Sequence, residues 1–218
     1  MSPELVGALV RILEVKDGST AAHTWRVVLY TRAMAEEAGV DKSDIARLTT
    51  AAALHDVGKI EVPDEILLKP GPLSPSEYKI MQTHAALGHE QLLRMGEDDP
   101  IILDLVRHHH ERMDGKGYPD GLTGPEIPDE ARMFAVIDSF DAMTSIRPYR
   151  HEVGPAAAAS AIEAIRAEVG TRYCDEHVER LATSYKAGRL NWILEYFNDS
   201  CPVPSYDQLS RATQIAAP

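Results

Sequence analysis

Residues 107–121 read RHHHERMDGKGYPDG, where three consecutive histidines precede a glycine-rich stretch. Imidazole rings bind first-row transition metals, so this run is a candidate for metal chemistry. Neighbouring side chains on a helix diverge by about 100°, so three adjacent rings cannot face one target inside a regular helix. The run therefore raises the question of which histidines act together and where the helix ends.

A second candidate is the pair His55-Asp56, which follows an apolar helical run in AAALHDVGK. Inside a continuous helix one of the two would be buried and the other exposed. At a helix end, both could reach one divalent ion, and imidazole with carboxylate suits iron, manganese or zinc. Lys59 lies three residues after Asp56 on the same face, where it is either a solvated lysine or a contact for an anionic substrate.

The elements that must position these residues are helices, because apolar residues recur mostly at three- and four-residue spacing and few segments alternate. Ser74, Pro75 and Glu77 form a helix-start signal with a capping box. Residues 61–75 and 114–128 are rich in Pro or Gly and are expected to be loops, the first with one short turn. The expected helices cover residues 3–15, 20–38, a start at Asp41 or Ser43 through to 58, 74–95, 99–110, 128–145, 155–169, 175–187 and 189–198.

The whole-chain composition narrows the classes of protein. The net charge of −12 over 218 residues argues against non-specific binding to nucleic acid or to acidic membrane surfaces, although local cations can still bind a small anion. Cys174 and Cys201 form no CxxC pair, and no apolar run approaches the roughly 20 residues that span a bilayer. With no signal-peptide pattern at the N-terminus, a soluble cytoplasmic protein is expected.

Several motifs together resemble one family. His55-Asp56 resembles the defining pair of the HD-domain metal-dependent phosphohydrolases, and HHERMDGKGYP at 109–119 resembles the HHExxDGxGYP signature of the HD-GYP cyclic di-GMP phosphodiesterases. HTWRV, THAALG and AVIDSFDAMTSIRPYR follow the family's order. The resemblance implies an all-α, HD-domain-like helical bundle with a few extra C-terminal helices. It covers residues 3–185 as a catalytic domain and leaves 186–218 as an extension of unknown role.

The resemblance also implies a metal centre with two divalent ions, most consistent with iron or manganese because the ligands include no cysteine. Asp56 would bridge the ions, and a water shared between them would lose its proton to become the nucleophile. The implied ligands are His23, His55, Asp56, His84, His109, His110 and Asp138.

The substrate contacts that the resemblance implies surround this centre. Asp56 and Lys59 would be catalytic, and the forked guanidinium groups of Arg147 and Arg150 could grip phosphate oxygens or guanine edges. Gly115, Gly117 and Gly121 fit either a loop that approaches a ligand closely or a plain surface turn. The implied contacts are Lys59, Asp114, Gly117, Tyr118, Asp141, Arg147 and Arg150.

Two positions depart from the family pattern. Some members carry a glutamate four residues before the first ligand histidine that helps hold a third metal, and here that position is Ser19. A two-metal centre is therefore expected. Ile146 replaces an acidic residue common before Arg-Pro-Tyr, which bears on loop packing or affinity.

The remaining histidines have no expected ligand role. His89 should face away from His84 on their helix, and His108, His151 and His177 fall outside the motif register. Glu111 either orients a ligand histidine or simply ends a helix, and we favour the first.

The leading hypothesis is hydrolysis of cyclic di-GMP to pGpG, with the end product left open between pGpG and GMP. The alternatives are a catalytically weak domain that binds cyclic dinucleotides for signalling, and an HD phosphohydrolase acting on another cyclic dinucleotide. The apolar first helix either pairs with a second copy in a homodimer or caps the bundle. A signalling-protein partner is expected if the chain is part of a longer protein.

Overall fold

A computed structural model describes residues 1–17, 20–145 and 153–196. These residues contain no β-sheet, only two isolated bridges, so the all-α prediction is confirmed. None of the helices in these ranges is both long and apolar enough to cross a membrane. The elements are α1 (Pro3–Lys16), α2 (Thr20–Glu37), α3 (Lys42–Leu54), η1 (Val57–Glu61), α4 (Asp64–Leu67), α5 (Pro75–Gln82), α6 (His84–Arg94), α7 (Pro100–His108), η2 (Gly124–Glu126), α8 (Asp129–Thr144), α9 (Pro155–Arg166), α10 (Asp175–Lys186) and α11 (Asn191–Tyr196).

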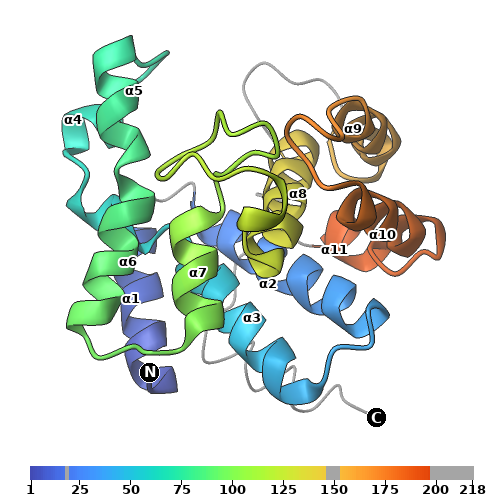
Figure 1. Ribbon diagram of the computed structural model, residues 1–218, viewed down its shortest axis with the longest axis horizontal. Helices are drawn as coiled ribbons and strands as arrows, with labels where there is room; N and C mark the ends of the chain where they lie inside the picture. Colours follow the sequence, from blue (N-terminus) through green and yellow to red (C-terminus); the bar gives the residue numbers. More distant parts are fainter. Residues whose placement is uncertain (18–19, 146–152, 197–218) are drawn as a thin grey trace.

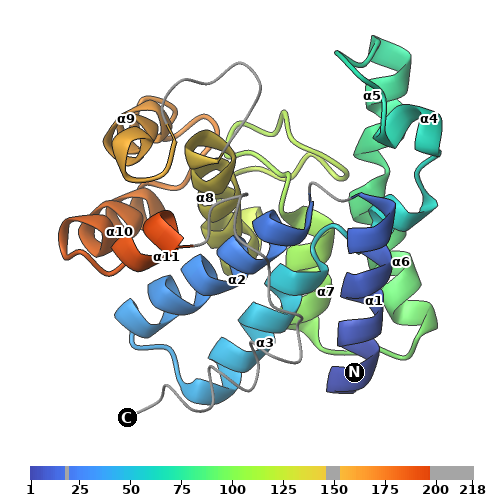
Figure 2. The same cartoon turned by 180° about the vertical axis from the view of Figure 1, so that it is seen from behind.

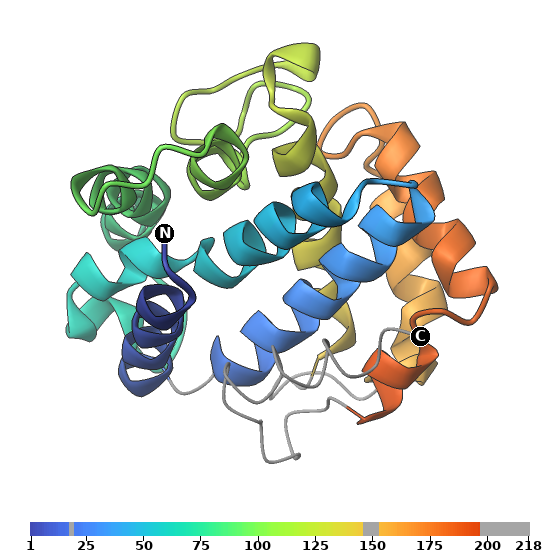
Figure 3. The ribbon, with the colours of Figure 1, turned by 90° about the horizontal axis from the view of Figure 1, so that it is seen from below.

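Helices α2, α3, α7 and α8 pack against one another at the centre of the bundle. Figure 3 shows α2 and α3 side by side, with α1 and α4–α6 at one end and α9–α11 at the other. Figure 2 shows the same two ends from behind. The central helices bury large side chains such as Trp25, Tyr30, Phe134 and Phe140. This packing fixes the helix ends from which the candidate ligands project.

Two helix starts follow from capping groups in the sequence. Ser74 and Glu77 form the expected capping box at α5. At α3, the carboxylate of Asp41 accepts hydrogen bonds from the backbone N–H groups of Ser43 and Asp44, so Asp41 rather than Ser43 is the N-cap.

The single helix expected over residues 74–95 is wrong, because α5 and α6 divide at Thr83. The backbone N–H of Thr83 bonds to the carbonyl of Ile80, and the Thr83 hydroxyl donates to the same oxygen at 2.7 Å. A threonine hydroxyl that occupies a carbonyl in this way competes with the helical ladder. The division makes His84 the first residue of α6.

Helix α3 ends at Leu54, four residues before the expected Gly58, and His55 and Asp56 leave it in a turn. Gly58 lies in η1, where a Cβ atom would fall 2.0 Å from the carbonyl oxygen of His84 and 2.4 Å from the backbone nitrogen of Gly88. Gly58 therefore permits η1 and α6 to touch backbone to backbone. That contact brings the His55-Asp56 turn beside His84.

The C-terminal helices continue the same core. Leu190, Ile193 and Leu194 are buried in the main cluster although they lie beyond the expected domain limit at 185. The folded unit therefore extends through α11 within the described ranges, and the division at 185 stays a prediction. Ser19, Ile146, Arg147, Arg150 and His151 lie outside the described residues, as do 197–218.

Candidate metal centre

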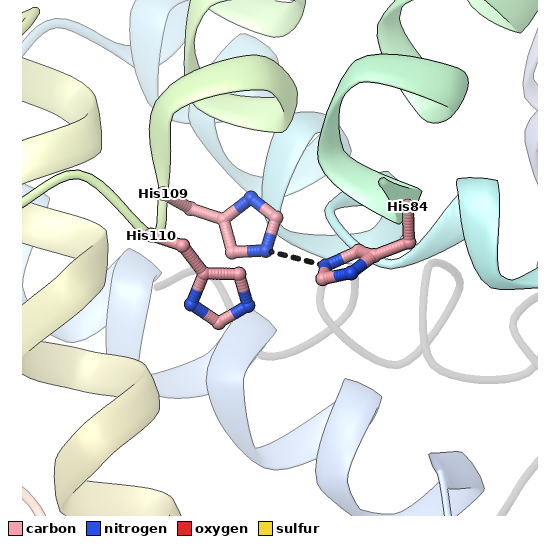
Figure 4. A group of neighbouring side chains, drawn as sticks. All are labelled: His84, His109 and His110. Atoms are coloured by element: carbon pink, nitrogen blue, oxygen red, sulfur yellow. Dashed lines mark hydrogen bonds between the residues drawn. The ribbon is translucent and has the colours of Figure 1, made fainter. Parts of the chain in front are cut away.

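Two groups of side chains at the centre of the bundle each bring three ligand atoms within 4.8 Å of one another. The His23 group consists of His23, His55 and Asp56, and the His84 group consists of His84, His109 and His110. Figure 4 shows the His84 group, in which rings from the start of α6 and the end of α7 converge. Helix α7 ends at His108, so His109 and His110 can serve one centre, which answers the question raised by the histidine run.

Backbone carbonyls fix the direction of three of these rings. The Nδ1 atoms of His55, His84 and His109 lie 2.8–2.9 Å from the carbonyl oxygens of Ala52, Met81 and Val106, each three residues earlier. A proton on Nδ1 satisfies that carbonyl and leaves the Nε2 lone pair facing inward, as in metal-binding histidines.

The inward nitrogen atoms provide a test of fit for a cation. The Nε2 atoms of His84 and His109 are 3.3 Å apart, and those of His23 and His55 are also 3.3 Å apart. With the Nδ1 protons committed to backbone carbonyls, the Nε2 lone pairs of His84 and His109 face each other without a proton between them. A divalent cation resolves that repulsion, so the residues present fit a metal.

Asp56 belongs to the His23 group and also reaches a histidine of the His84 group. One carboxylate oxygen, Oδ2, is 3.2 Å from Nε2 of His55, and the other, Oδ1, is 3.3 Å from Nε2 of His84. The side chain is buried, and Oδ1 has no hydrogen-bond partner within the described structure. A buried carboxylate oxygen without a donor is costly in a folded protein, and a bound cation would remove that cost.

The protonation tendencies of the two groups differ. Burial and the neighbouring histidines hold the pKa values of His109 and His110 well below the usual range, and burial also lowers the pKa of His84. Burial opposes the charge of His23 too, but hydrogen bonding and attraction to Asp141, with attraction to Asp138, outweigh it and raise the pKa. The His84 group is thus a set of neutral nitrogen donors.

Carboxylates surround the His23 group. Burial disfavours the charge of Asp56, yet His55 and Lys59 outweigh it and hold the pKa of Asp56 well below its usual value. Asp138 projects from α8 with Oδ1 3.4 Å from Nε2 of His23. This distance places Asp138 within reach of an ion bound by the His23 group.

Asp141 was expected to contact substrate, and the structure places it elsewhere. The side chain is fully buried, with Oδ2 2.9 Å from Nδ1 of His23 and Oδ1 accepting a 2.6 Å bond from Nε of Arg26. Ser145 adds a further donor. Because both oxygens are occupied inside the protein, Asp141 orients the His23 ring. Arg26, three residues after His23 in HTWRV, had been missed.

Glu111 was expected to orient a ligand histidine, and that interpretation is wrong. Its buried carboxylate accepts backbone N–H groups of Asp120, Gly121 and Leu122 at 2.7–3.1 Å. Glu111 therefore clamps the loop after the histidines. His108, which belongs to neither ligand group, adds a contact of 3.1 Å to Asp120 at the same point.

The loop glycines mostly serve the protein's own backbone. Gly115 and Gly121 have positive φ values of 73° and 67°, which favour glycine. A Cβ on Gly117 would lie 2.4 Å from the Cα of Glu111, so the close approach expected toward a ligand is to the chain itself. Asp114, another expected substrate contact, bonds through both oxygens to the guanidinium of Arg112 at 3.0 Å.

Tyr118 and Lys59, two expected substrate contacts, lie next to candidate metal ligands. The Tyr118 ring lies 4.8 Å from the ring of His110, and burial raises the pKa of its hydroxyl, which stays protonated. The Nζ atom of Lys59 lies 2.6 Å from Oδ2 of Asp56. Burial opposes the Lys59 charge, but Asp56 outweighs it and raises the pKa.

A pocket of about 330 Å³ opens beside the centre between the glycine loop (residues 109–123, from the end of α7 to η2), α5, α8 and the segment after α9. His109, His110 and Asp138 line it together with Gly117 and Tyr118. The other contributors come together only in the folded chain, and Tyr78, Gln82, Arg172 and Tyr173 lie outside the motifs quoted above. Those that the sequence analysis missed include Tyr78, Gln82, Arg112, Arg172 and Tyr173.

His89 and His177, which had no expected ligand role, lie outside both groups. His177 places Nε2 3.0 Å from Asp129 and so links α10 to the start of α8.

A helical bundle that gathers histidine and aspartate side chains from five segments into one buried centre has the architecture of the HD-domain class. The sequence matches the HD domain family over residues 7–178, and the chain belongs to that family. The relatives below also support the HD-GYP resemblance.

Three curated relatives are similar over much of this chain. The "Cyclic di-GMP phosphodiesterase response regulator RpfG" of Xanthomonas campestris is 43% identical over 67% of this chain and 39% of its own length. A "Cyclic di-GMP phosphodiesterase" of Thermotoga maritima is 41% identical over 81% of this chain and 47% of its own. The "3'3'-cGAMP-specific phosphodiesterase 2" of Vibrio cholerae is 40% identical over 68% of this chain and 29% of its own. The chain thus spans less than half of each relative.

Solved structures share the fold. A cyclic GMP-AMP specific phosphodiesterase of V. cholerae, V-cGAP3, aligns with a TM-score of 0.68 at 16% identity, over 99% of this chain and 54% of that one. The HD domain of the L. monocytogenes phosphodiesterase PgpH, in complex with cyclic-di-AMP, aligns with a TM-score of 0.62 at 17% identity, over 84% and 95%. Both confirm the expected HD-like helical bundle.

Proposed function

We propose that this chain is a metal-dependent phosphodiesterase that hydrolyses cyclic di-GMP to pGpG and onward to GMP. The observation that carries the proposal is the position of Asp56, whose two oxygens each face one group of inward-pointing histidine nitrogens. If two ions bind, His55, His84 and Asp138 stand where they could serve as further ligands beside Asp56.

Two divalent ions at this centre would lower the pKa of a shared water and neutralise charge on the phosphodiester under attack. The chain's own residues prepare the site for that chemistry. Backbone carbonyls and Asp141 hold the ligand rings in place, and burial keeps the His84 group neutral and able to donate its lone pairs.

Lys59 supplies the mobile positive charge in this proposal. Its ammonium group lies against Asp56 at the edge of the centre and keeps its proton. When cations neutralise Asp56, the same group can turn to a phosphate oxygen and stabilise the charge that develops during cleavage.

Cyclic di-GMP is the preferred substrate because the two relatives with the higher identities carry that name. Hydrolysis of 3'3'-cGAMP is a second candidate, favoured by the name of a relative at 40% identity. A catalytically weak binding domain is the third candidate. The chain keeps a histidine or aspartate at each candidate ligand position, which argues against that candidate.

Purified protein loaded anaerobically with iron or manganese is the test, with cyclic di-GMP, 3'3'-cGAMP and cyclic di-AMP as substrates and products resolved by liquid chromatography. The proposal predicts the fastest turnover for cyclic di-GMP, with pGpG appearing before GMP. Faster turnover of 3'3'-cGAMP would select the second candidate. Binding without turnover at full metal occupancy would select the third.

Several finer expectations remain part of the proposal. Iron and manganese are favoured because the ligands are nitrogen and oxygen atoms only. A cytoplasmic location, a signalling-protein partner and a homodimer through α1 stay predictions. On α1 the side chains of Leu5, Ile12 and Val15 are exposed, which is the surface such a dimer would cover.

A further inference from the structure

We infer that Arg172 is a substrate-binding residue that holds the phosphodiester of the cyclic dinucleotide that is not being cleaved. This inference rests on the proposed function and deepens it. A cyclic dinucleotide carries two phosphodiesters, and only one can lie over the metal centre at a time. The other needs a cation away from the ligands, in a protein whose net charge is −12.

The pocket beside the metal centre offers three cationic side chains, Arg112, Lys116 and Arg172. Two of them have Asp114 as a carboxylate partner, since Asp114 accepts hydrogen bonds from Nε and Nη2 of Arg112 and lies 3.8 Å from Nζ of Lys116. Arg172 has no carboxylate within ion-pair distance among the described residues. Among the three cations that the described residues place at the pocket, Arg172 is therefore the one without a carboxylate partner.

An aromatic ring positions Arg172 without neutralising it. The guanidinium carbon lies 5.4 Å from the ring centroid of Tyr173, within the range of a cation–π contact. Tyr173 is itself fixed, because its ring is buried and its hydroxyl donates a 2.8 Å bond to Ser139 on α8. Ser139 follows the candidate ligand Asp138 in the chain. The hydrogen bond from Tyr173 therefore connects the ring beneath Arg172 to the helix that carries Asp138.

The backbone that carries Arg172 is also fixed. The amide nitrogen of Arg172 bonds to the carbonyl of Glu168 at 2.8 Å, and the carbonyl of Thr171 accepts the N–H of Asp114 at 2.8 Å. In Figures 1 and 2 the segment between α9 and α10 accordingly lies beside the glycine loop. Arg172 thus projects from a docked segment at the pocket, with a planar fork that matches two oxygens of a phosphate.

The test compares a dinucleotide with a substrate that has a single phosphodiester. Steady-state kinetics are measured for cyclic di-GMP and for bis(p-nitrophenyl) phosphate, with wild type, Arg172→Gln, Arg172→Lys and the control Arg180→Gln. Arg180 lies on neighbouring α10, pairs with Glu176 and does not line the pocket, so its change removes the same charge nearby. Metal content is measured for each variant.

Arg172→Gln is expected to raise KM for cyclic di-GMP about tenfold, because a charge-assisted contact is lost. It should leave bis(p-nitrophenyl) phosphate kinetics and metal content unchanged. Arg172→Lys should recover part of the loss, and Arg180→Gln should match wild type. The inference is overturned if KM for cyclic di-GMP changes less than twofold in Arg172→Gln, or if both substrates suffer equally. Wild type that cleaves bis(p-nitrophenyl) phosphate but no cyclic dinucleotide overturns the proposed function itself, and the inference with it.

Discussion

The His23 group and the His84 group have similar geometry and different electrostatics. Each brings three ligand atoms together, and each includes a pair of Nε2 atoms 3.3 Å apart. The His23 group includes Asp56 and has Asp138 and Asp141 around it, whereas the His84 group consists of buried imidazoles with depressed pKa values. The first side can compensate the charge of an ion, and the second supplies neutral donors and relies on Asp56 for charge.

Asp56→Asn should have the largest effect, because Asp56 provides the negative charge that both groups share. Removing one partner from a buried charged site costs about 3–5 kcal/mol, so both ions should be lost and turnover should fall to background. Metal analysis and a cyclic di-GMP assay measure this. Asp98→Asn, which changes an exposed aspartate between α6 and α7, should keep both. Retention of two ions by Asp56→Asn would break the bridging assignment.

Single histidine variants separate the two groups. His23→Ala and His110→Ala should each lose about one ion per chain and reduce turnover by roughly 10³-fold, equivalent to about 4 kcal/mol in the barrier. At limiting metal, His110→Ala should lose its ion more completely, because the remaining donors of the His84 group are neutral. His108→Ala, at the adjacent position outside both groups, should keep both ions. Loss of both ions from His23→Ala alone would show that the groups are not separate sites.

Lys59→Met tests whether Lys59, beside Asp56 of the His23 group, contacts the substrate without binding a metal. Lys59 touches Asp56 without being a ligand, so this variant should keep its metal while kcat falls about 10²-fold, the loss typical of removing one group that stabilises developing charge. Lys16→Met, which removes a lysine bonded to the carbonyls of Ile60 and Val62, controls for a general effect on η1. A Lys59→Met protein that loses metal in proportion to activity contradicts the substrate role.

Glu111→Gln acts on the His84 side and should have the smallest effect. The amide keeps one acceptor oxygen but points an N–H₂ group at backbone donors, so we expect a loss of about 2 kcal/mol in the free energy of unfolding. Metal content should stay normal, and KM should rise a few-fold as the loop loosens. Urea denaturation and kinetics measure both. Glu126→Gln, which alters an exposed capping glutamate in the same loop, is the matched control.

The sequence predicted the all-α fold, which is confirmed, and the structure gathers His23, His55, His84, His109 and His110 into two groups that could hold a metal ion. A motif can identify such candidates because the residue types and spacings that bind a metal are visible in the sequence. The local break at Thr83 was missed because it depends on one hydroxyl competing for one carbonyl.

The contacts that sequence reasoning did not foresee depend on partners distant in the chain. Asp141 became a support for His23 because Arg26, 115 residues earlier, occupies its carboxylate. Arg172 joins the pocket only because the segment after α9 docks on the glycine loop. No periodicity or motif in a single sequence reports such contacts between segments.

The central claim is that the two groups bind two ions that share Asp56, and the number of metal ions per chain tests it most directly. Anaerobically prepared wild type, saturated with iron or manganese and freed of excess metal, should contain about two ions per chain, and Asp56→Asn should contain close to none. One ion per saturated wild-type chain, or two ions retained by Asp56→Asn, would contradict the account.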